Sequence, residues 1–300
     1  MRTVHLWRPT PSTIGLFALS FFAGGPVHAQ PSCSVALELK APKAGNIFSL
    51  RQEQILGDIE AEWVESNYGL ANDERLRVHL NAVAGRILSQ FPRDQARVRI
   101  ILIDTPAAGS FSTGPERIYI TRKMVALLRN DDELAGLLGH ELGHIFGHDN
   151  AIVVSQLFHE ILGVSAVSNR KDISEKLKRM LDSIDRDTRL LRKAAQIIER
   201  HEATHQYEAD RVGLYALAAS GFSPKAYVEL FDRSAETNGR TGNPLGNFFG
   251  VTTSDEKRLR EINKTLRRFP QSCRETDPVA SAEFQAWQAA VLSYPDTAQR

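Results

Sequence analysis

The chain lacks the features that mark several large classes of protein. Its 37 basic and 36 acidic residues leave a formal net charge of +1, so the basic surface that nucleic-acid binding requires is missing. No apolar run approaches the roughly 20 residues that a membrane-spanning helix needs. Only two cysteines occur among 300 residues, so at most one internal disulfide can form. What is present, a chain with 42% apolar residues, is long enough to bury one substantial core, as a globular enzyme does.

The first 29 residues have the pattern of a secretory signal peptide. Arg2 and Arg8 precede the apolar run IGLFALSFFAGG at 14–25, and Ala29 supplies a small residue before the expected cleavage point. The run of about twelve residues is short for a membrane anchor. We therefore predict a cleaved leader and a periplasmic or secreted protein, with an uncleaved anchor as the alternative.

Export determines the domain organisation that we expect. A signal peptide at 1–29 would be followed by the folded domain at 30–274 and a C-terminal helix or tail at 275–300. In an oxidising compartment Cys33 and Cys273 can pair, so a disulfide joining the two ends of the chain is the preferred interpretation. Two unpaired thiols remain an alternative, because sequence does not establish proximity. Lipidation of Cys33 is disfavoured, because the preceding AQPS lacks the usual pattern.

Helical periodicity dominates the folded part, with one strand-rich segment. Apolar residues at helical spacing predict helices over 49–69 and 73–91. β-Branched runs predict strands at 97–104 and 116–122, joined by a turn-rich connection at 105–115. The predicted fold class is α+β, mostly α-helical, with a small sheet.

Two further helices are expected towards the C-terminus. Steps of four and three between apolar residues predict one long amphipathic helix spanning 177–198. We expect the apolar stripe of this helix to pack on the core, in preference to forming a docking surface for a partner. Binding to a membrane surface is the least favoured role, because acidic residues alternate with basic ones. The last segment predicts a short helix anchored by Phe284, Trp287 and Val291.

The segment GHELGHIFGHDN at 139–150 carries three histidines and a glutamate. The polar residues at 130–132 can cap a helix start, which places this segment on a helix. His140 and His144 then lie one turn apart on the same face and can bind one metal ion. Glu141 is placed beside them to act as a general base. One zinc ion suits this set, because zinc accepts imidazole nitrogens and lowers the pKa of a bound water to about 7.

The third histidine of the segment is not expected to be a ligand. His148 lies eight residues beyond His140, which is about 12 Å along an unbroken helix. A different protease pattern, HExxHxxGxxH, is matched at Gly147 but requires a histidine where this chain has Asn150. That pattern is therefore the disfavoured alternative.

A second helix is predicted around EADRVGLYALAASGF at 208–222. Together with HELGH, it resembles the gluzincin metallopeptidase family forty-eight, a family of zinc proteases. The resemblance extends over RQEQILGDIEAEW at 51–63, over the run at 109–149 and over SDEKRLREI at 254–262. It implies a zincin-like fold and the hydrolysis of peptide bonds.

The resemblance also implies roles for individual residues. His140 and His144 would bind zinc, Glu141 would be the general base, and Asp210 would fix the orientation of one histidine. The strand at 116–122 would resemble the sheet edge along which the family binds peptide by strand addition.

The third metal ligand departs from the family pattern. The resemblance implies a glutamate four residues before Asp210, and this chain has Gln206 there. An amide carbonyl is a neutral and poor ligand for zinc. Glu208 would serve as the third ligand if the helix were shifted, since it lies about 200° around a regular helix from Asp210. Glu202 lies on the right face but further away. Otherwise Gln206 binds zinc weakly, or the protein binds peptide without cutting it.

The predicted function is that of an exported zinc endopeptidase acting on unfolded or misassembled polypeptides, with no nucleic-acid partner. The alternative is a non-catalytic, peptide-binding or chaperone-like member of the family. Peripheral membrane association stays open, and the sequence does not give the oligomeric state. Thr252 and Thr253 replace the His-Pro pair that caps the metal in some relatives, so an inhibitory histidine is not expected.

Overall fold

The computed structural model describes residues 35–37, 39, 45–92, 97–105, 107–237, 256–274 and 277–295. These residues belong to one compact unit, Ser32–Arg300. The predicted leader, Cys33 and the Thr252–Thr253 pair lie outside the described residues, so the expectations that concern them stay predictions.

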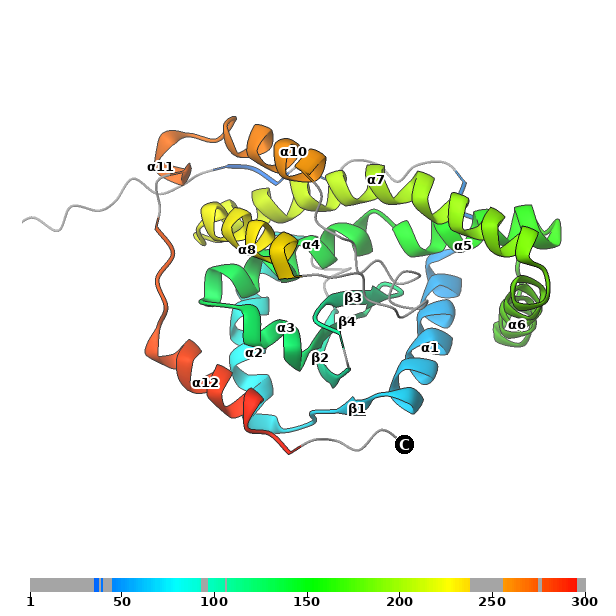
Figure 1. The fold of residues 1–300 in the computed structure, drawn as a ribbon, viewed down its shortest axis with the longest axis horizontal. Helices are drawn as coiled ribbons and strands as arrows, with labels where there is room; N and C mark the ends of the chain where they lie inside the picture. The colour runs from blue at the N-terminus through cyan, green and yellow to red at the C-terminus, as the bar shows by residue number, and fades with distance from the viewer. Residues whose placement is uncertain are drawn as a thin grey trace, which may run out of the picture. The chain divides into compact units, whose positions relative to one another are not determined.

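A mixed sheet of four strands lies at the centre of the fold. The strands are β1 (Gly69–Leu70), β2 (Arg99–Asp104), β3 (Ser110–Thr113) and β4 (Arg117–Thr121), in the order β1-β2-β4-β3. β2 and β4 are parallel, whereas β1 and β3 each pair antiparallel with their neighbour. The predicted α+β class, mostly helical with a small sheet, is confirmed (Figure 1).

The predicted strands at 97–104 and 116–122 are confirmed as β2 and β4, but the expectation that the second of them is a sheet edge is wrong. The strand predicted at 116–122 is β4, but β4 pairs on both sides and is not an edge. The edges are β1 and β3, and β3, the edge beside α4, lies within the segment predicted as a turn-rich connection. Its sequence SFST carries too few β-branched or apolar residues to be recognised as a strand. Gly114, with φ of 54°, allows the tight turn that folds β3 back onto β4.

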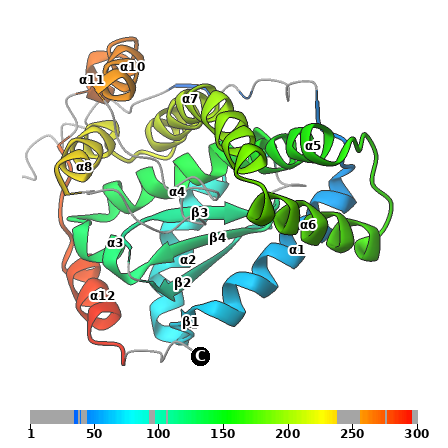
Figure 2. The ribbon, with the colours of Figure 1, turned by 45° about the vertical axis from the view of Figure 1, so that its right-hand side comes forward.

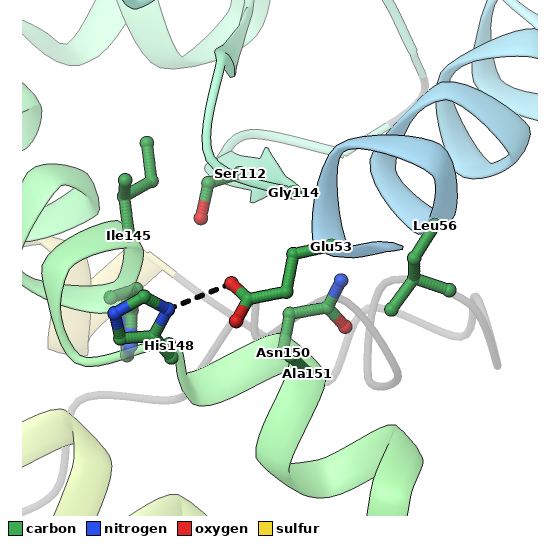
Figure 3. Close-up of a pocket in the computed structure, with 9 residues that line it drawn as sticks. Glu53, Leu56, Ser112, Gly114, Ile145, His148, Asn150 and Ala151 are labelled. Atoms are coloured by element: carbon green, nitrogen blue, oxygen red, sulfur yellow. Dashed lines mark hydrogen bonds and ion pairs between the residues drawn. The ribbon is translucent and has the colours of Figure 1, made fainter. Parts of the chain in front are cut away.

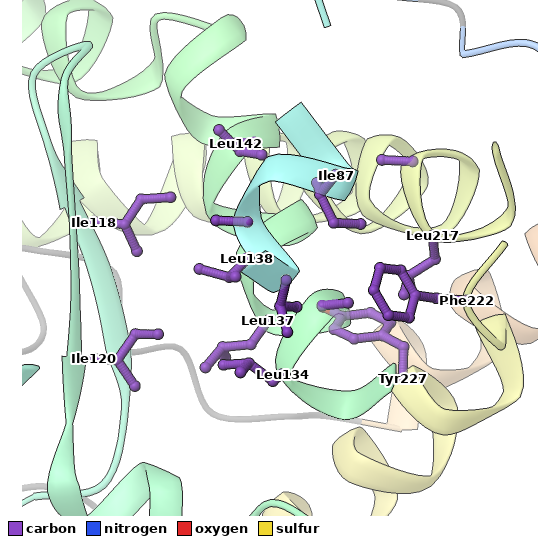
Figure 4. Close-up of a cluster of buried hydrophobic side chains, with 14 of the residues drawn as sticks. Ile87, Ile118, Ile120, Leu134, Leu137, Leu138, Leu142, Leu217, Phe222 and Tyr227 are labelled. Atoms are coloured by element: carbon purple, nitrogen blue, oxygen red, sulfur yellow. The ribbon is translucent and has the colours of Figure 1, made fainter. Parts of the chain in front are cut away.

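Helices cover both faces of the sheet (Figure 2). α1 (Leu50–Asn67) packs on one face, where Ala61 and Val64 contact Phe111 and Tyr119. α2 (Glu74–Leu88) and α4 (Asp131–Phe146) pack on the other face. Figure 4 shows this second layer, in which the side chains of β4 face those of α4. The predicted helices at 49–69 and 73–91 are confirmed.

The remaining helices are α3 (Arg122–Leu127), α5 (Asp149–Leu162), α6 (Arg170–Arg186), α7 (Thr188–Ala219) and α8 (Pro224–Thr237). The single helix predicted over 177–198 is therefore two helices, α6 and the first turns of α7. The break is at Asp187, whose side chain accepts a hydrogen bond from the Arg189 N–H and caps α7. The break shifts the buried face of α7 to Ala194 and Ile197 and leaves Leu191 exposed.

α4 and α7 cross at very short range because small residues line their contact. A Cβ atom on Gly143 would lie 2.6 Å from Ala209 Cα, and one on Gly139 would lie 3.0 Å from Gly213 Cα. The two backbones therefore approach more closely than larger side chains would allow. This crossing holds the HExxH turn of α4 against the middle of α7.

The C-terminal part adds α10 (Glu256–Leu266), α11 (Gln271–Arg274) and α12 (Ala282–Leu292). α12 packs on α2 and α3 through the predicted anchor of Phe284, Trp287 and Val291, all of which are buried. Cys273 on α11 is buried, and its predicted bond to Cys33 stays a prediction. Among the described residues, no helix combines the length and the apolar character needed to cross a membrane.

Candidate metal centre

The two histidines of the HELGH motif face each other across one turn of α4. Their Nε2 atoms are 3.1 Å apart. His140 Nδ1 lies 2.9 Å from Asp210 Oδ1, and His144 Nδ1 lies 2.7 Å from Asp149 Oδ2. Because a carboxylate accepts the Nδ1 proton of each neutral ring, each Nε2 presents its lone pair to the space between the rings.

This geometry fits zinc. Two tetrahedral zinc–nitrogen bonds of the usual length would place the two nitrogens roughly 3.3 Å apart, close to the observed 3.1 Å. Two lone pairs at this distance repel each other unless a proton or a cation lies between them. Burial lowers the pKa of His140. Burial acts in the same direction on His144, but the hydrogen bond that His144 donates to Asp149 and the negative charges of Asp149 and Glu141 together outweigh it and raise the pKa of His144.

The third side chain at this point is Gln206. It is buried on α7, and its Nε2 lies 3.2 Å from His144 Nε2. Rotation of the amide by 180° brings its oxygen to the position of Nε2. A metal would bind this oxygen. Within the described ranges, no three His, Cys, Asp or Glu side chains are grouped to hold a metal ion, because the third converging group is an amide.

Glu208 does not join this group. α7 runs unbroken through this region, so the helix shift that Glu208 binding would require is not seen. The Glu208 carboxylate instead pairs with Arg211, at 2.6 Å. The side chain of Glu202 is not among those described.

A buried network holds Asp210 behind His140. Arg258, from α10, donates from Nε and Nη2 to the two Asp210 oxygens, each at 2.6 Å. The Tyr227 hydroxyl, from α8, donates to Asp210 Oδ1 at 2.6 Å. Burial alone would raise the pKa of Asp210, but Arg258 and these hydrogen bonds hold it well below its usual range. Asp210 is therefore a charged acceptor for the His140 Nδ1 proton.

Glu141 points towards the edge strand. Its carboxylate is buried, and Oε1 accepts a hydrogen bond of 2.6 Å from Ser110 Oγ on β3. The contact ties the candidate general base to the strand that borders the site. It also leaves Oε2 as the oxygen that is not engaged by Ser110.

Several of these partners were not identified from sequence. Asp149 lies in the quoted GHDN segment and Arg258 in the SDEKRLREI segment, so position within motif-like runs was a usable signal. Ser110 also lies in such a run, at 109–149, but its residue type did not mark it as a partner of Glu141, and Tyr227 lies outside these runs. His205, one residue before Gln206, also contacts Asp149, with Nδ1 3.2 Å from Oδ1.

His148 is separate from this group, as the sequence predicted, but for a different reason. α4 ends at Phe146, and His148 adopts a left-handed conformation with φ of 55°. Its Nδ1 contacts Glu53 Oε2 of α1 at 2.7 Å. This hydrogen bond raises the pKa of His148, and burial opposes the rise only in part.

An HExxH helix on a small mixed sheet, with a second helix placing an aspartate behind the first histidine, defines the class of zincin-like metallopeptidases. The chain belongs to peptidase family M48, whose model matches residues 71–290.

Similar proteins include the mitochondrial metalloendopeptidase OMA1 of Schizosaccharomyces pombe, which is 24% identical over 226 residues, covering 74% of this chain and 63% of the relative. The beta-barrel assembly-enhancing protease of Escherichia coli strain K12 is 23% identical over 192 residues, covering 63% and 39%. A protease HtpX homolog of Pyrobaculum islandicum is 34% identical over 114 residues, covering 35% and 30%. The chain thus spans less than two thirds of the length of these relatives.

Proposed function

We propose that this chain is a zinc-dependent endopeptidase that cuts unfolded or misassembled polypeptides in the cell envelope. The observation that carries the proposal is the convergence of two Nε2 lone pairs, 3.1 Å apart, beside the buried carboxylate of Glu141. The names of the relatives, among them a metalloendopeptidase and a beta-barrel assembly-enhancing protease, support the reaction and the choice of envelope substrates.

His140, His144 and the Gln206 amide oxygen would hold the zinc ion. When bound, zinc supplies Lewis-acid polarisation of the scissile carbonyl and lowers the pKa of a water molecule. Glu141 Oε2 takes the proton from the attacking water and passes it to the leaving amine nitrogen. Ser110 restrains the other carboxylate oxygen, so that the base keeps its direction during both transfers. Asp210 and Asp149 keep each Nδ1 protonated and each Nε2 available.

Edge strand β3 would bind the substrate. Thr121 N–H donates to Gly109 O, at 3.0 Å, and hydrogen-bonded pairs alternate along an antiparallel ladder. The pairs of Ser110 and Ser112 with β4 are therefore of the non-hydrogen-bonded kind, and their backbone N–H and C=O groups point away from β4. An extended peptide would pair with these groups by strand addition.

The test is metal analysis and a casein assay on purified protein. We expect about one zinc per chain and proteolysis that Glu141→Gln abolishes with zinc retained. Glu62→Gln, on the exposed side of α1 and paired with Arg170, is the control and should cut at the wild-type rate. Absence of both zinc and cleavage would overturn the proposal.

A second candidate, a peptide-binding factor without catalysis, is favoured by one observation, the amide at Gln206. It predicts that the protein binds an unfolded polypeptide and leaves it intact after zinc has been added in excess. Cleavage under the same conditions excludes this candidate.

Export to an oxidising compartment is part of the proposal, and it rests on the leader-like N-terminus. A bond between Cys33 and Cys273 is the expected consequence of export. Alkylation of the unfolded protein with and without prior reduction tests the bond between Cys33 and Cys273. Labelling that requires reduction supports the bond, and equal labelling in both samples rules it out.

A further inference from the structure

A pocket opens beside His144, at the end of edge strand β3 (Figure 3). Four parts of the chain form its wall: the first turns of α1, the end of β3, the last turn of α4 and the start of α5. Ser112 lies on the β3 side and Ile145 on the α4 side. The pocket therefore adjoins both the candidate metal centre and the strand that would bind peptide, and nothing in the proposed chemistry uses it.

The far wall of the pocket combines the apolar side chains of Leu56 and Ala151 with a firmly held set of polar side chains. Glu53, which is buried, receives a hydrogen bond of 2.7 Å from Asn46 Nδ2 and contacts His148 Nδ1 at 2.7 Å. Asn150 Nδ2 donates to both oxygens of buried Glu60, at 2.9 and 2.8 Å. Both carboxylates come from α1, one two turns beyond the other, so α1 fixes the shape of this wall.

Hydrogen-bonding capacity is left over in this wall. Glu53 is fully engaged by Asn46 and His148, but no described residue hydrogen-bonds to the Ser112 hydroxyl or to the Asn150 side-chain oxygen. A polar side chain entering the pocket can pair with these two atoms. A large apolar side chain would remove water from them and from the Glu53–His148 pair without replacing any hydrogen bond, which costs free energy.

The direction of the peptide decides which substrate residue reaches the pocket. Ser110 lies at Glu141, and Ser112 lies two residues further along β3, about 7 Å away for an extended strand. Antiparallel pairing, the more stable arrangement per residue, places the amino-terminal part of the peptide at Ser112 and the carboxyl-terminal part at Ser110. The side chain that enters the pocket therefore belongs to the amino side of the scissile bond.

We infer that this pocket selects polar side chains over large apolar ones on the amino side of the scissile bond, through the Glu53–His148 pair and its neighbours Ser112 and Asn150. The inference rests on the proposed function, and it assigns the substrate preference of the same site.

The test is a peptide library varied on the amino side of the cleavage point, with products identified by mass spectrometry. Wild-type protein should cut peptides with Ser, Thr, Asn or Gln at the pocket position, two residues before the one that lies at Ser110, about tenfold faster than peptides with Leu or Phe there, the range expected for discrimination in a single pocket. Glu53→Leu with His148→Leu replaces the ion pair by apolar groups, an exchange that folded proteins often tolerate. In this variant Leu should become the preferred residue.

Two controls isolate the pocket. His79→Leu with Asp131→Leu removes another histidine–carboxylate pair, with a separation of 2.6 Å and a histidine as exposed as His148, on α2 and α4 away from the pocket. Glu53→Gln with His148→Gln keeps the wall polar. Both control variants should retain the wild-type preference.

The same peptides are also titrated against the Glu141→Gln protein, in which binding is measured without cleavage. If wild type and the Glu53→Leu, His148→Leu variant both cut peptides and prefer the same residues, the pocket inference is wrong and the proposed function stands. If the Leu variant does not fold, a loss of the polar preference in the Gln variant contradicts the inference instead. Protein that neither cuts nor binds any peptide overturns both.

Discussion

Gln206 reaches the two histidines from α7 with a neutral amide, where a glutamate would bring a negative charge. Two neutral imidazoles and an amide leave the full positive charge of a zinc ion uncompensated by its direct ligands. The negative charges of Asp149 and Asp210 lie behind the imidazole rings, each one hydrogen bond away from its ring. Arg258 offsets the charge of Asp210. Weaker metal binding is the expected consequence at this residue.

Gln206→Glu should therefore tighten zinc binding by tenfold or more, because it adds a charged oxygen ligand at a position that already faces His144. Competition with a chromophoric chelator measures the affinity. Glu208→Gln is the matched control: its carboxylate pairs with Arg211, and the zinc affinity should stay unchanged. Loss of metal from the Glu208 variant would show that the helix shifts on metal binding and that the assignment of Gln206 is wrong.

Glu60 gives a second residue-scale prediction, for stability against pH. Burial raises the pKa of Glu60 from 4.5 to about 8, so the folded protein keeps a proton that the unfolded chain releases. The stabilising contribution is complete below pH 4.5 and is lost as the pH rises towards 8. Glu60→Gln imitates the protonated form and removes this dependence. Between pH 4.5 and 8, urea unfolding should show that the free energy of unfolding of Glu60→Gln rises relative to that of wild type, by up to about 1.4 kcal/mol per pH unit. Parallel stability curves for the two proteins would contradict this.

At the scale of elements, the site depends on how closely α4 and α7 approach. Gly139 and Gly143 on α4 face Gly213 and Ala209 on α7. Gly139, just before the HELGH motif, and Gly143, within it, therefore act at the helix crossing, while His140 and His144, each directly after one of these glycines, would act at the metal. The crossing sets the separation between the histidines and Gln206.

Gly143→Ala should push the two helices apart. The new Cβ would meet Ala209 Cα at 2.6 Å, and overpacking of this kind costs about 1–3 kcal/mol. Gly85→Ala on α2 is the control, because no atom lies within 4 Å of the added Cβ. It should gain up to about 1 kcal/mol from helix propensity. Thermal unfolding of the two variants compares them, and a Gly143 variant as stable as the Gly85 variant would argue against the tight crossing.

Local sequence was enough to predict some helices and strands but not others. α1, α2 and α4 were predicted because strong periodicity and capping residues act locally. β3 was missed because it exists only through its pairing with β4 and the turn at Gly114. The break at Asp187 was missed because the apolar spacing continues across it, and only the capping role of that aspartate ends the regular helix.

At the scale of the whole molecule, the site combines residues that are far apart in sequence. The motif spacing identified His140, Glu141 and His144, because these lie within one helical turn of each other. Resemblance added Asp210. No local pattern could show that Tyr227 and Arg258 reach the same carboxylate, since that depends on how α8 and α10 fold back over α7. The sequence therefore gave the reactive groups but not the network that orients them.

The last prediction concerns Arg258, which links α10 to Asp210 behind His140. Its guanidinium is buried, makes two contacts of 2.6 Å with Asp210 and lies 4.7 Å from the centre of the Phe231 ring. Arg258→Gln leaves a buried carboxylate without its counter-charge, and we expect a loss of about 3–5 kcal/mol in the free energy of unfolding. Zinc affinity should fall about tenfold, because His140 loses its fixed orientation.

The control is Arg260→Gln, on the exposed side of the same helix, where the arginine contacts only Glu256 among described residues, at 3.5 Å. Its cost should stay within about 0.5 kcal/mol, as is usual for exposed ion pairs. Urea unfolding and chelator competition are run on both variants. Arg258→Lys keeps the charge but not the two-pronged geometry, so it should fold and fall between wild type and Arg258→Gln in both measurements. If Arg258→Gln and Arg260→Gln cost the same, the contact between Arg258 and Asp210 does not stabilise the fold, and Tyr227 and His140 suffice to hold Asp210.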